Sequence, residues 1–461
     1  MAFNFIKSDR NQDFLLPPSL RDWLPPGDLA WLVIDAVSEM DISAFYKKYR
    51  KDGTGHEAFD PAMMVTLLLY AYSVGVRSSR RIEQLCERDI AFRVIATNLV
   101  PDHCTISRFR KENGLAISGL FTQILKLCHE AGLVKLGVVA LDGTKMKADA
   151  ALDSNRTYDH IKQEVENMLA DADANDLLED ALYGSDKRGD ELPEELSNPT
   201  SRKARLGRCK KQLEERAAAE AADKQAKIDK RKAEEDEAGK KKRGRKPKEP
   251  DSEPESGAKA NITDPDSRIM KGRSGYVQGF NGQAVVTEGQ IIIAAALTDE
   301  ANDVNQLHPM MLKAQENLTV MDPEAELKIK VNLADAGYMS EDNLSKIDPS
   351  GPEHIIATRK DWKQRKEEAE APPPRGRIPK GLTPKQLMDR KLLTKRGKNL
   401  YKKRGKTVEP VFGQIKNARG IRHFLRRGLE ACAQEWNLIC STHNLLKLWR
   451  SGKGIAAQMA V

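Results

Sequence analysis

Residues 136–150 read LGVVALDGTKMKADA and form the stretch on which the fold assignment depends. Apolar and β-branched residues continue up to Asp142-Gly143, which predicts a buried strand that ends in an exit turn. Similar apolar runs between turn residues predict further strands at residues 275–286, 290–297, 326–334 and 354–358. Helical patterns follow at residues 305–316, 406–417 and 429–449. Together these elements predict an α/β sheet domain over residues 135–150 and 258–450.

The chain before this domain predicts a different class of structure. Apolar residues recur at helical spacing between proline breaks, which indicates an all-α N-terminal domain over residues 1–134. Residues 78–98 and 101–114 have the pattern of a helix, a turn and a second helix. Four polar side chains lie where a recognition helix would face DNA, namely Thr105, Ser107, Arg108 and Arg110. A bundle helix with a solvated basic face fits the same spacing, so both interpretations stay open.

Residues 151–257 interrupt the sheet domain with a highly charged insertion. They are rich in Glu, Lys, Ala and Asp and almost lack aromatic residues, which predicts exposed helix followed by a flexible basic run. The run KKKRGRKPK, residues 240–248, resembles a minor-groove arm in which Arg243 and Arg245 flank a glycine. A solubilising charge run is the alternative. Residues 451–461 are predicted to form a flexible tail.

Composition narrows the class of protein without identifying its chemistry. A chain of 461 residues suggests roughly three structural units, and a net charge of +8 favours a polyanionic partner. The longest uncharged stretch, residues 62–76, is too short to span a membrane and predicts a buried helix. The N-terminus has no secretory pattern, so a cytoplasmic protein is expected. The six cysteines lack the spacing of a disulfide framework or a zinc site.

Three acidic residues in the sheet domain point to metal-dependent phosphoryl transfer. Asp142 and Asp335 each end an apolar strand, and Glu409 lies in a predicted helix. Carboxylates that converge at strand ends can hold two Mg²⁺ ions beside a scissile phosphate. Lys416 follows Glu409 by about two helical turns, so both side chains are expected on one face, where a lysine can hold a phosphate. Taken singly, Asp142 could form a turn and Asp335 could cap a helix.

Several segments resemble one known family. The chain is similar to DDE transposases with an RNase H-like catalytic domain, within the superfamily of bacterial insertion sequences numbered four and five, and most similar to the group numbered eleven eighty-two. The matching segments are FLLPPSLRDWLP, YRKDGTGHEAFDPAMMVTLLLYAYSVGVRSSRRIE, PDHCTISRFR, ALDGTKMKADAA, DPDSRIMK, GYVQGFNGQAVV, ADAGY and Y-x-x-R-x-x-x-x-EPVFGQIK. They cover most of the chain outside the insertion.

The resemblance implies a site, residue by residue. Asp142, Asp335 and Glu409 correspond to the three catalytic acids and metal ligands, and Tyr401, Arg404, Glu409 and Lys416 correspond to the Tyr-Arg-Glu-Lys signature. One departure concerns Arg404, because four residues separate it from Glu409 where the superfamily usually has three. Tyr401, Arg404 and Lys416 are expected to contact DNA.

The resemblance also implies an activity and its partners. Two Mg²⁺ ions, replaceable by Mn²⁺, would support hydrolysis at a terminal inverted repeat and then attack of the new 3′-hydroxyl on target DNA. The expected partners are double-stranded DNA at the repeats and at the target, and a second copy of the chain in a homodimer or larger synaptic complex. No nucleotide cofactor is expected, and the protein would act in the bacterial cytoplasm at the nucleoid.

Two other functions fit parts of the sequence. A DNA-binding repressor without catalysis would need only the helix-turn-helix and the basic arm. An RNA-binding or scaffold protein could be built around the charged insertion. Neither requires apolar strands that end in acids, which is why a metal-dependent enzyme is the preferred interpretation.

Overall fold

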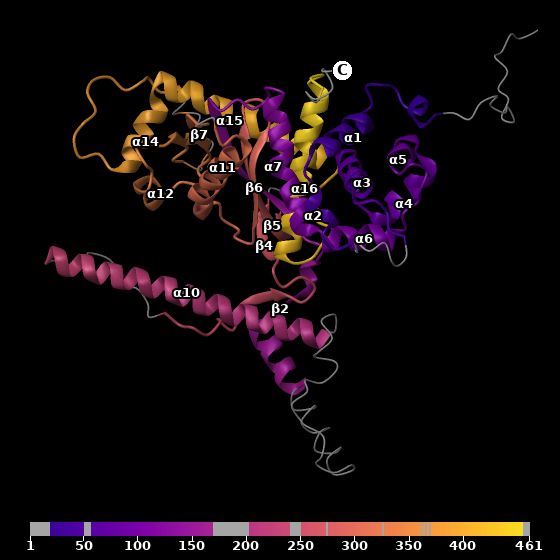
Figure 1. Ribbon diagram of the computed structural model, residues 1–461. Helices are drawn as coiled ribbons and strands as arrows, with labels where there is room; N and C mark the ends of the chain where they lie inside the picture. Colours follow the sequence, from indigo (N-terminus) through magenta and orange to yellow (C-terminus); the bar gives the residue numbers. More distant parts are fainter. Residues whose placement is uncertain are drawn as a thin grey trace, which may run out of the picture.

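The computed structural model describes residues 19–49, 57–168, 202–239, 250–272, 275–324, 327–359, 361, 363–364, 367 and 370–454. Figure 1 shows three parts: a group of N-terminal helices, a sheet with its covering helices, and the long helix α10, which extends away from the rest. Among the described helices, none has the length and apolar character needed to cross a membrane.

The N-terminal part is helical, as the sequence predicts. Its elements are η1 (Leu20–Trp23), α1 (Leu29–Glu39), α2 (Ser43–Tyr46), α3 (Pro61–Ser73), α4 (Ser79–Arg88), α5 (Ile90–Ile95), α6 (His103–Glu112) and α7 (Gly114–Glu130). Asp60 accepts a hydrogen bond from the Ala62 amide and Pro61 occupies the first turn, which fixes where α3 begins. Helix α3 is buried on nearly all sides and accounts for the long uncharged stretch.

The predicted helix over residues 78–98 is two helices in the structure. Asp89 separates α4 from α5, because its side chain accepts hydrogen bonds from the Ala91 and Phe92 amides and caps a new helix. Helix α6 follows after a loop and packs on α4. The helix-turn-helix-like region is therefore a group of three short helices.

Within the described residues, six strands form one mixed sheet. They are β1 (Val138–Lys147), β4 (Arg268–Gly272), β5 (Gly275–Thr287), β6 (Ile292–Thr298), β7 (Val331–Ala334) and β8 (Glu353–Ile356). Strand β5 pairs with β1 along one edge and with β4 and then β6 along the other. Strands β1, β7 and β8 are parallel neighbours. This is a mixed α/β arrangement of the RNase H-like kind that the resemblance implies.

Strand β1 differs from the prediction at its carboxyl end. It passes through Asp142-Gly143 without turning and continues to Lys147, paired antiparallel with β5 from Val139 opposite Thr287 to Lys147 opposite Gly279. The Asp-Gly pair reads as a turn in isolation, but the ladder to β5 satisfies the backbone groups of the extended strand. Asp142 therefore lies in the middle of a strand, just beyond the segment paired with β7.

Helices cover both faces of the sheet. Helix α11 (Leu307–Met321) packs on β5 and β6, and α15 (Lys395–Gly413) packs on β1 and β7, beside α12 (Glu341–Ser345) and α14 (Pro384–Leu393). Pro410 lies inside α15 and donates no hydrogen bond, so the carbonyl of Lys406 instead accepts one from Gln290 at 3.4 Å. A π-helical turn, Gln414–Ala418, follows α15.

The last helix, α16 (Leu429–Arg450), joins the N-terminal helices to the sheet. It packs on α3, α7 and β6, and its Asn444 exchanges two hydrogen bonds with the backbone of Ile292, at 2.9 and 2.8 Å. One continuous hydrophobic core extends from Leu29 to Leu448. Helix α16, which the sequence predicted at residues 429–449, is buried on most sides.

The charged insertion contains a small core of its own. Strands β2 (Asn155–Thr157) and β3 (Lys259–Asn261) pair antiparallel, residues 158–168 are helical, and α10 (Arg202–Ala238) packs beside them. The core consists of Tyr158, Ile161, Leu206, Cys209, Leu213 and Ala260. At 1.5 Å per residue α10 is roughly 55 Å long. The sequence predicted the exposed helix but not this core, since its apolar residues are widely spaced.

Candidate active site

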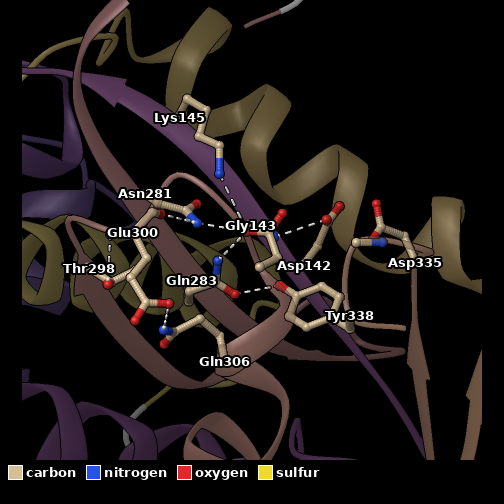
Figure 2. A network of polar contacts seen from close by, with 12 residues as sticks. Asp142, Gly143, Lys145, Asn281, Gln283, Thr298, Glu300, Gln306, Asp335 and Tyr338 are labelled. Carbon is tan, nitrogen blue, oxygen red and sulfur yellow. Dashed lines mark hydrogen bonds and ion pairs between the residues drawn. The ribbon is translucent and has the colours of Figure 1, made fainter. Parts of the chain in front are cut away.

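Two of the three predicted acids lie side by side in the structure. Leu141 pairs in parallel register with Ala334, so Asp142 and Asp335, the next residues on each strand, leave the paired segment together. The carboxyl ends of parallel strands meet at one edge of a sheet, where sites are commonly built. Figure 2 shows the two aspartates as neighbours at this edge.

Arg404 of α15 joins these two acids. Its Nη2 atom lies 2.8 Å from Oδ2 of Asp142 and 3.8 Å from Oδ2 of Asp335. The side chains of Arg404 and Asp142 are only 12% and 16% exposed, so each needs a partner of opposite charge. The guanidinium therefore acts as the positive charge that this pair of carboxylates requires.

The pKa values of these groups reflect the crowding of like charges. The pKa of Asp142 is raised from 3.8 to about 6, chiefly because the carboxyl is buried; Arg404 lowers it, and Asp335 adds to the rise. Burial alone would lower the pKa of Arg404, but Asp142 and Asp335 hold it above its usual value. The pair of acids thus favours any added positive charge.

Glu409 lies on α15 but outside this ion-paired group. It is exposed, and its carboxylate runs back along its own helix, 3.5 Å from the position that a Cβ atom would take at Gly405. Among the described residues, no three His, Cys, Asp or Glu side chains gather closely enough to hold a metal ion. The structure therefore brings Asp142 and Asp335 together around Arg404, while Glu409 remains on the helix beside them.

The other signature residues also lie on this side of β1. Lys416 donates a hydrogen bond at 2.7 Å to the carbonyl of Lys145, beyond Asp142 on the same strand. It belongs to the π-helical turn after α15, so the α-helical spacing that relates it to Glu409 in the sequence does not continue to Lys416. Tyr401 lies half-buried on α15 and packs against the core.

A fourth acid, Asp303, was missed by the sequence analysis. It precedes η3 (Val304–Gln306), and its Oδ1 atom accepts hydrogen bonds from Asn281 at 2.7 Å and Gln283 at 2.8 Å and lies 3.4 Å from the Lys145 ammonium. The signal in the sequence is the pair of amides at alternate positions of an otherwise apolar strand, because alternate side chains point to one face.

The same network continues to the loop that carries Asp335. Gln283 accepts a hydrogen bond from the hydroxyl of the buried Tyr338, and its backbone carbonyl accepts one from Trp436 of α16 at 3.1 Å. Figure 2 shows Gln283 between Gly143 and Tyr338. The amide thereby ties strand β5 to the loop after β7 and to the core.

A hollow of about 510 Å³ opens beside these acids. It is lined by residues 301–304, residues 335–337 and Met339. A Cβ atom at Gly337 would lie 2.9 Å from Oδ1 of Asp335 and 3.2 Å from Oδ2 of Asp303, so a glycine keeps the space between the two carboxylates open. Gly143 has a similar role, because its Cβ atom would lie 2.4 Å from the Gln283 amide.

The predicted DNA-facing residues of α6 divide into two sets. Ser107 and Arg108 are exposed. Thr105 is half-buried, and its amide and hydroxyl donate hydrogen bonds to the Asp102 carboxylate, which caps the helix. Arg110 instead points inward and donates to the Tyr72 hydroxyl at 3.0 Å and to the Arg77 carbonyl at 2.9 Å. Its expected place on a DNA-facing surface is therefore corrected: two residues beyond Arg108, about 200° around the helix, its side chain points into the contact with α3.

Two other basic regions are the run at residues 240–248 and the stretch that follows α15. Arg243 and Arg245 lie outside the described residues. In the stretch after α15, Arg419 donates to Thr442 at 2.7 Å and Arg426 donates to Gln434 at 2.8 Å, so both stabilise the position of α16. Arg427 pairs with Asp149 at 2.9 Å on the surface.

Comparison with protein families assigns both ends of the chain to transposases. Residues 257–445 match the family model described as a transposase DDE domain, and residues 18–112 match a family model described as a transposase domain. The chain is a DDE transposase of an insertion sequence. Among curated proteins and solved structures, no match to this transposase was found.

The family models cover different parts of the site. Asp335 and Glu409 lie inside the DDE match, whereas Asp142 lies before it, separated by the insertion. A DDE domain implies nuclease and strand-transferase activity, and the register between β1 and β7 brings Asp142 beside the matched region.

The residues of the transposase site fit a divalent cation by their chemistry. All the donors are oxygens, which Mg²⁺ and Mn²⁺ prefer. The guanidinium of Arg404 stands where Asp142 and Asp335 need positive charge, and the buried Oδ1 atom of Asn281 has no hydrogen-bond partner. Both features are expected where an acidic site accepts a cation.

Proposed function

We propose that this transposase binds the terminal inverted repeats of its insertion sequence and cleaves and joins DNA strands at Asp142, Asp335 and Glu409. The observation that carries the proposal is the parallel register of β1 and β7, which puts two carboxylates side by side at one sheet edge. Helix α15, with Glu409, packs directly on these strands. An acidic edge of this kind suits phosphoryl transfer that depends on divalent metal ions.

Asp142, Asp335 and Glu409 would hold the divalent ions, two in the scheme implied by the family, with Mg²⁺ as the natural metal and Mn²⁺ as its substitute. Bound there, the ions would lower the pKa of the attacking water and stabilise the leaving oxygen. A water oxygen attacks the phosphorus in line and the 3′ oxygen leaves as a hydroxyl. That 3′-hydroxyl then attacks a phosphorus atom of the target strand, so no covalent protein intermediate and no nucleotide cofactor are needed.

Two basic residues of the site would contact DNA phosphates in this proposal. With a cation in the site, Arg404 would no longer pair with Asp142 and would contact a DNA phosphate, for which its planar guanidinium is suited. Lys416, held against β1 by the Lys145 carbonyl, lies on the same side of the strand and contacts phosphate near the cut. Tyr401, on the same face of α15 as Arg404, packs against the DNA backbone.

The N-terminal helices would recognise the repeat. Ser107 and Arg108 are the exposed polar residues of α6, and Thr105 adds a hydroxyl near its start. Arg243 and Arg245 would add a minor-groove contact that tolerates different sequences. Pairing two element ends requires two active sites, so the working form is a homodimer or larger, in the bacterial cytoplasm at the nucleoid.

A cleavage assay with purified protein tests the proposal. Asp335→Asn and Glu409→Gln should each lower strand cleavage at a repeat end about a thousandfold or more, because the ions contribute several kcal/mol to the barrier. Binding to the repeat should stay close to wild type. Asp153→Asn, an exposed acid just beyond β1, serves as the matched control and should remain active.

Two results would contradict the proposal. Full activity of Asp335→Asn would remove the site from this edge of the sheet. A wild-type protein that binds the repeat but shows no metal-dependent cleavage would favour a DNA-binding protein without catalysis.

A further inference from the structure

The proposed site uses one side of the sheet, and an unassigned acid faces it from the other side. Asp142 and Gly143 are consecutive on β1, so they point to opposite faces. Asp142 contacts Arg404 of α15, whereas the position of a Gly143 Cβ atom lies 2.5 Å from Oδ1 of Asp303, next to α11. Asp335, at the end of β7, lies between these two acids.

Asp303 is held in a fixed orientation. Its Oδ1 atom receives Asn281, Gln283 and Lys145, which come from two neighbouring strands. The Oδ2 atom faces Gly337 and flanks the same empty Cβ position as Oδ1 of Asp335. The two carboxylates therefore line one wall of the 510 Å³ hollow together.

A second observation points to a ligand at this place. The side chain of Asn281 is fully buried, and its Oδ1 atom has no hydrogen-bond partner, although its amide group donates to Asp303 and to the Glu300 carbonyl. That oxygen lies 2.9 Å from the Gly143 Cβ position. A hydrogen-bond acceptor that is buried without a donor destabilises the fold. A bound group that accepts the oxygen's lone pair, such as a cation, would remove this cost.

The charges at this edge of the sheet support a cation as that group. Asp142, Asp335 and Asp303 carry three negative charges, while Arg404 and Lys145 supply two positive ones. Glu409 on the adjacent helix adds a further negative charge. A divalent cation would restore the balance at the edge of the sheet.

We propose that Asp303 is a fourth acid of the catalytic centre and, together with Asp335, helps to hold the divalent cation on the α11 side of the sheet. The inference rests on the proposed function, since it concerns the cation which that function requires. Asn281 and Gln283 act as positioning residues, because they orient the Asp303 carboxylate, whereas the Lys145 ammonium competes with the cation for the same carboxylate.

Calorimetric titration of the metal-free full chain with Mn²⁺ tests this assignment. Asp303→Asn should weaken Mn²⁺ binding by roughly tenfold or more. Lys145→Met, which removes a positive charge from the same ion pair, should not weaken it. Asp348→Asn, an exposed loop acid, is the control and should bind as the wild type does.

The outcomes distinguish the role proposed for Asp303 from the proposed function on which it rests. Wild-type Mn²⁺ affinity in a folded Asp303→Asn protein overturns the inference, as does an equal loss in Asp303→Asn and Lys145→Met, which would indicate a structural ion pair. If Asp142→Asn also keeps full Mn²⁺ affinity, the proposed function fails instead.

A second measurement needs no variant and so does not depend on the folding of Asp303→Asn. Fe²⁺ bound in place of Mn²⁺ produces hydroxyl radicals with ascorbate and peroxide, and these cut the backbone close to the ion. We expect cuts at residues 301–304 in addition to those near Asp142 and Asp335. Cuts near Asp142 and Asp335 without any at 301–304 would overturn the assignment.

Discussion

Two clusters of largely buried charged side chains in the described part of this transposase are built differently. Between the N-terminal helices and α16, Glu435 accepts hydrogen bonds from Arg77 at 2.9 Å, from Tyr72 at 3.5 Å and from the Leu425 amide at 3.0 Å. Both carboxylate oxygens are satisfied, and the space around them holds no water-sized void. We call this group the interdomain cluster.

The cluster at the sheet edge is the opposite in each respect. Its carboxylates outnumber its cations, the Asn281 oxygen is unsatisfied, and a hollow of about 510 Å³ opens beside Asp335. A buried ion pair that is complete holds two parts of a fold together, whereas one that lacks positive charge is a site for a ligand. The difference separates a structural use of buried charge from a catalytic one.

The largest effect should come from breaking the interdomain cluster. Glu435→Gln leaves Arg77 buried without its counter-charge, and losing one partner of a buried ion pair typically costs about 3–5 kcal/mol. Urea or thermal denaturation of the variant should show this loss, with no change that depends on divalent metal. A loss below about 1 kcal/mol would mean that the cluster does not hold the two parts together.

Removing an acid from the cluster at the sheet edge, which we call the catalytic cluster, should instead raise the free energy of unfolding. The pKa of Asp142 is raised to about 6 in the folded chain. The wild type therefore loses stability as the pH rises from ~4 to about 6, and the full loss is present above that pH. Below pH ~4 there is no loss, because the carboxyl is protonated in both the folded and the unfolded state. Asparagine resembles the protonated acid. Without divalent metal, Asp142→Asn should therefore be more stable than wild type at pH 7.5, since Asp335 remains as a counter-charge for Arg404.

The pH dependence is the check on that prediction. The difference in unfolding free energy between Asp142→Asn and wild type should shrink as the pH falls from 6 toward 4, measured in a chelating buffer. A variant that is less stable than wild type at pH 7.5, or a difference independent of pH, would contradict the account of the catalytic cluster.

A smaller effect should distinguish the two arginines of α6. Arg108 is exposed, so Arg108→Ala should weaken binding to the repeat by about 1–3 kcal/mol and leave folding unchanged. Arg110 donates a hydrogen bond to Tyr72 of the interdomain cluster, so Arg110→Ala should lower the melting temperature instead. Equal losses of Arg108→Ala on repeat and random DNA would make Arg108 a phosphate contact only.

The sequence predicts the strands well, and it also indicates that Asp142 and Asp335 follow apolar runs, because both features have strong local signals. Each of Asp142 and Asp335 ends a run of apolar residues, and parallel neighbours bring such ends together. The break at Asp89 also had a local signal, a capping aspartate inside an otherwise helical pattern. The helical spacing of the apolar residues continues on both sides of Asp89, so the spacing alone predicts one unbroken helix.

Contacts between distant residues could not be predicted in the same way. Asp303 is one of several acids in a short loop, and only its pairing with Asn281, Gln283 and Lys145 distinguishes it. Arg110 has the spacing of a DNA contact, but tertiary packing against Tyr72 decides its direction. The strand through Gly143 likewise depends on the ladder to β5, which overrides the local preference of Asp-Gly for a turn.

The central claim, that Asp142 is a direct metal ligand of the catalytic centre, is tested most directly by exchanging metal and ligand together. Strand cleavage at a repeat end would be followed for Asp142→Cys with Mg²⁺ and with Mn²⁺. Mg²⁺ avoids sulfur and Mn²⁺ tolerates it better, so the account predicts no cleavage with Mg²⁺ and partial recovery with Mn²⁺. Equal activity of Asp142→Cys and wild type in Mg²⁺ would contradict it.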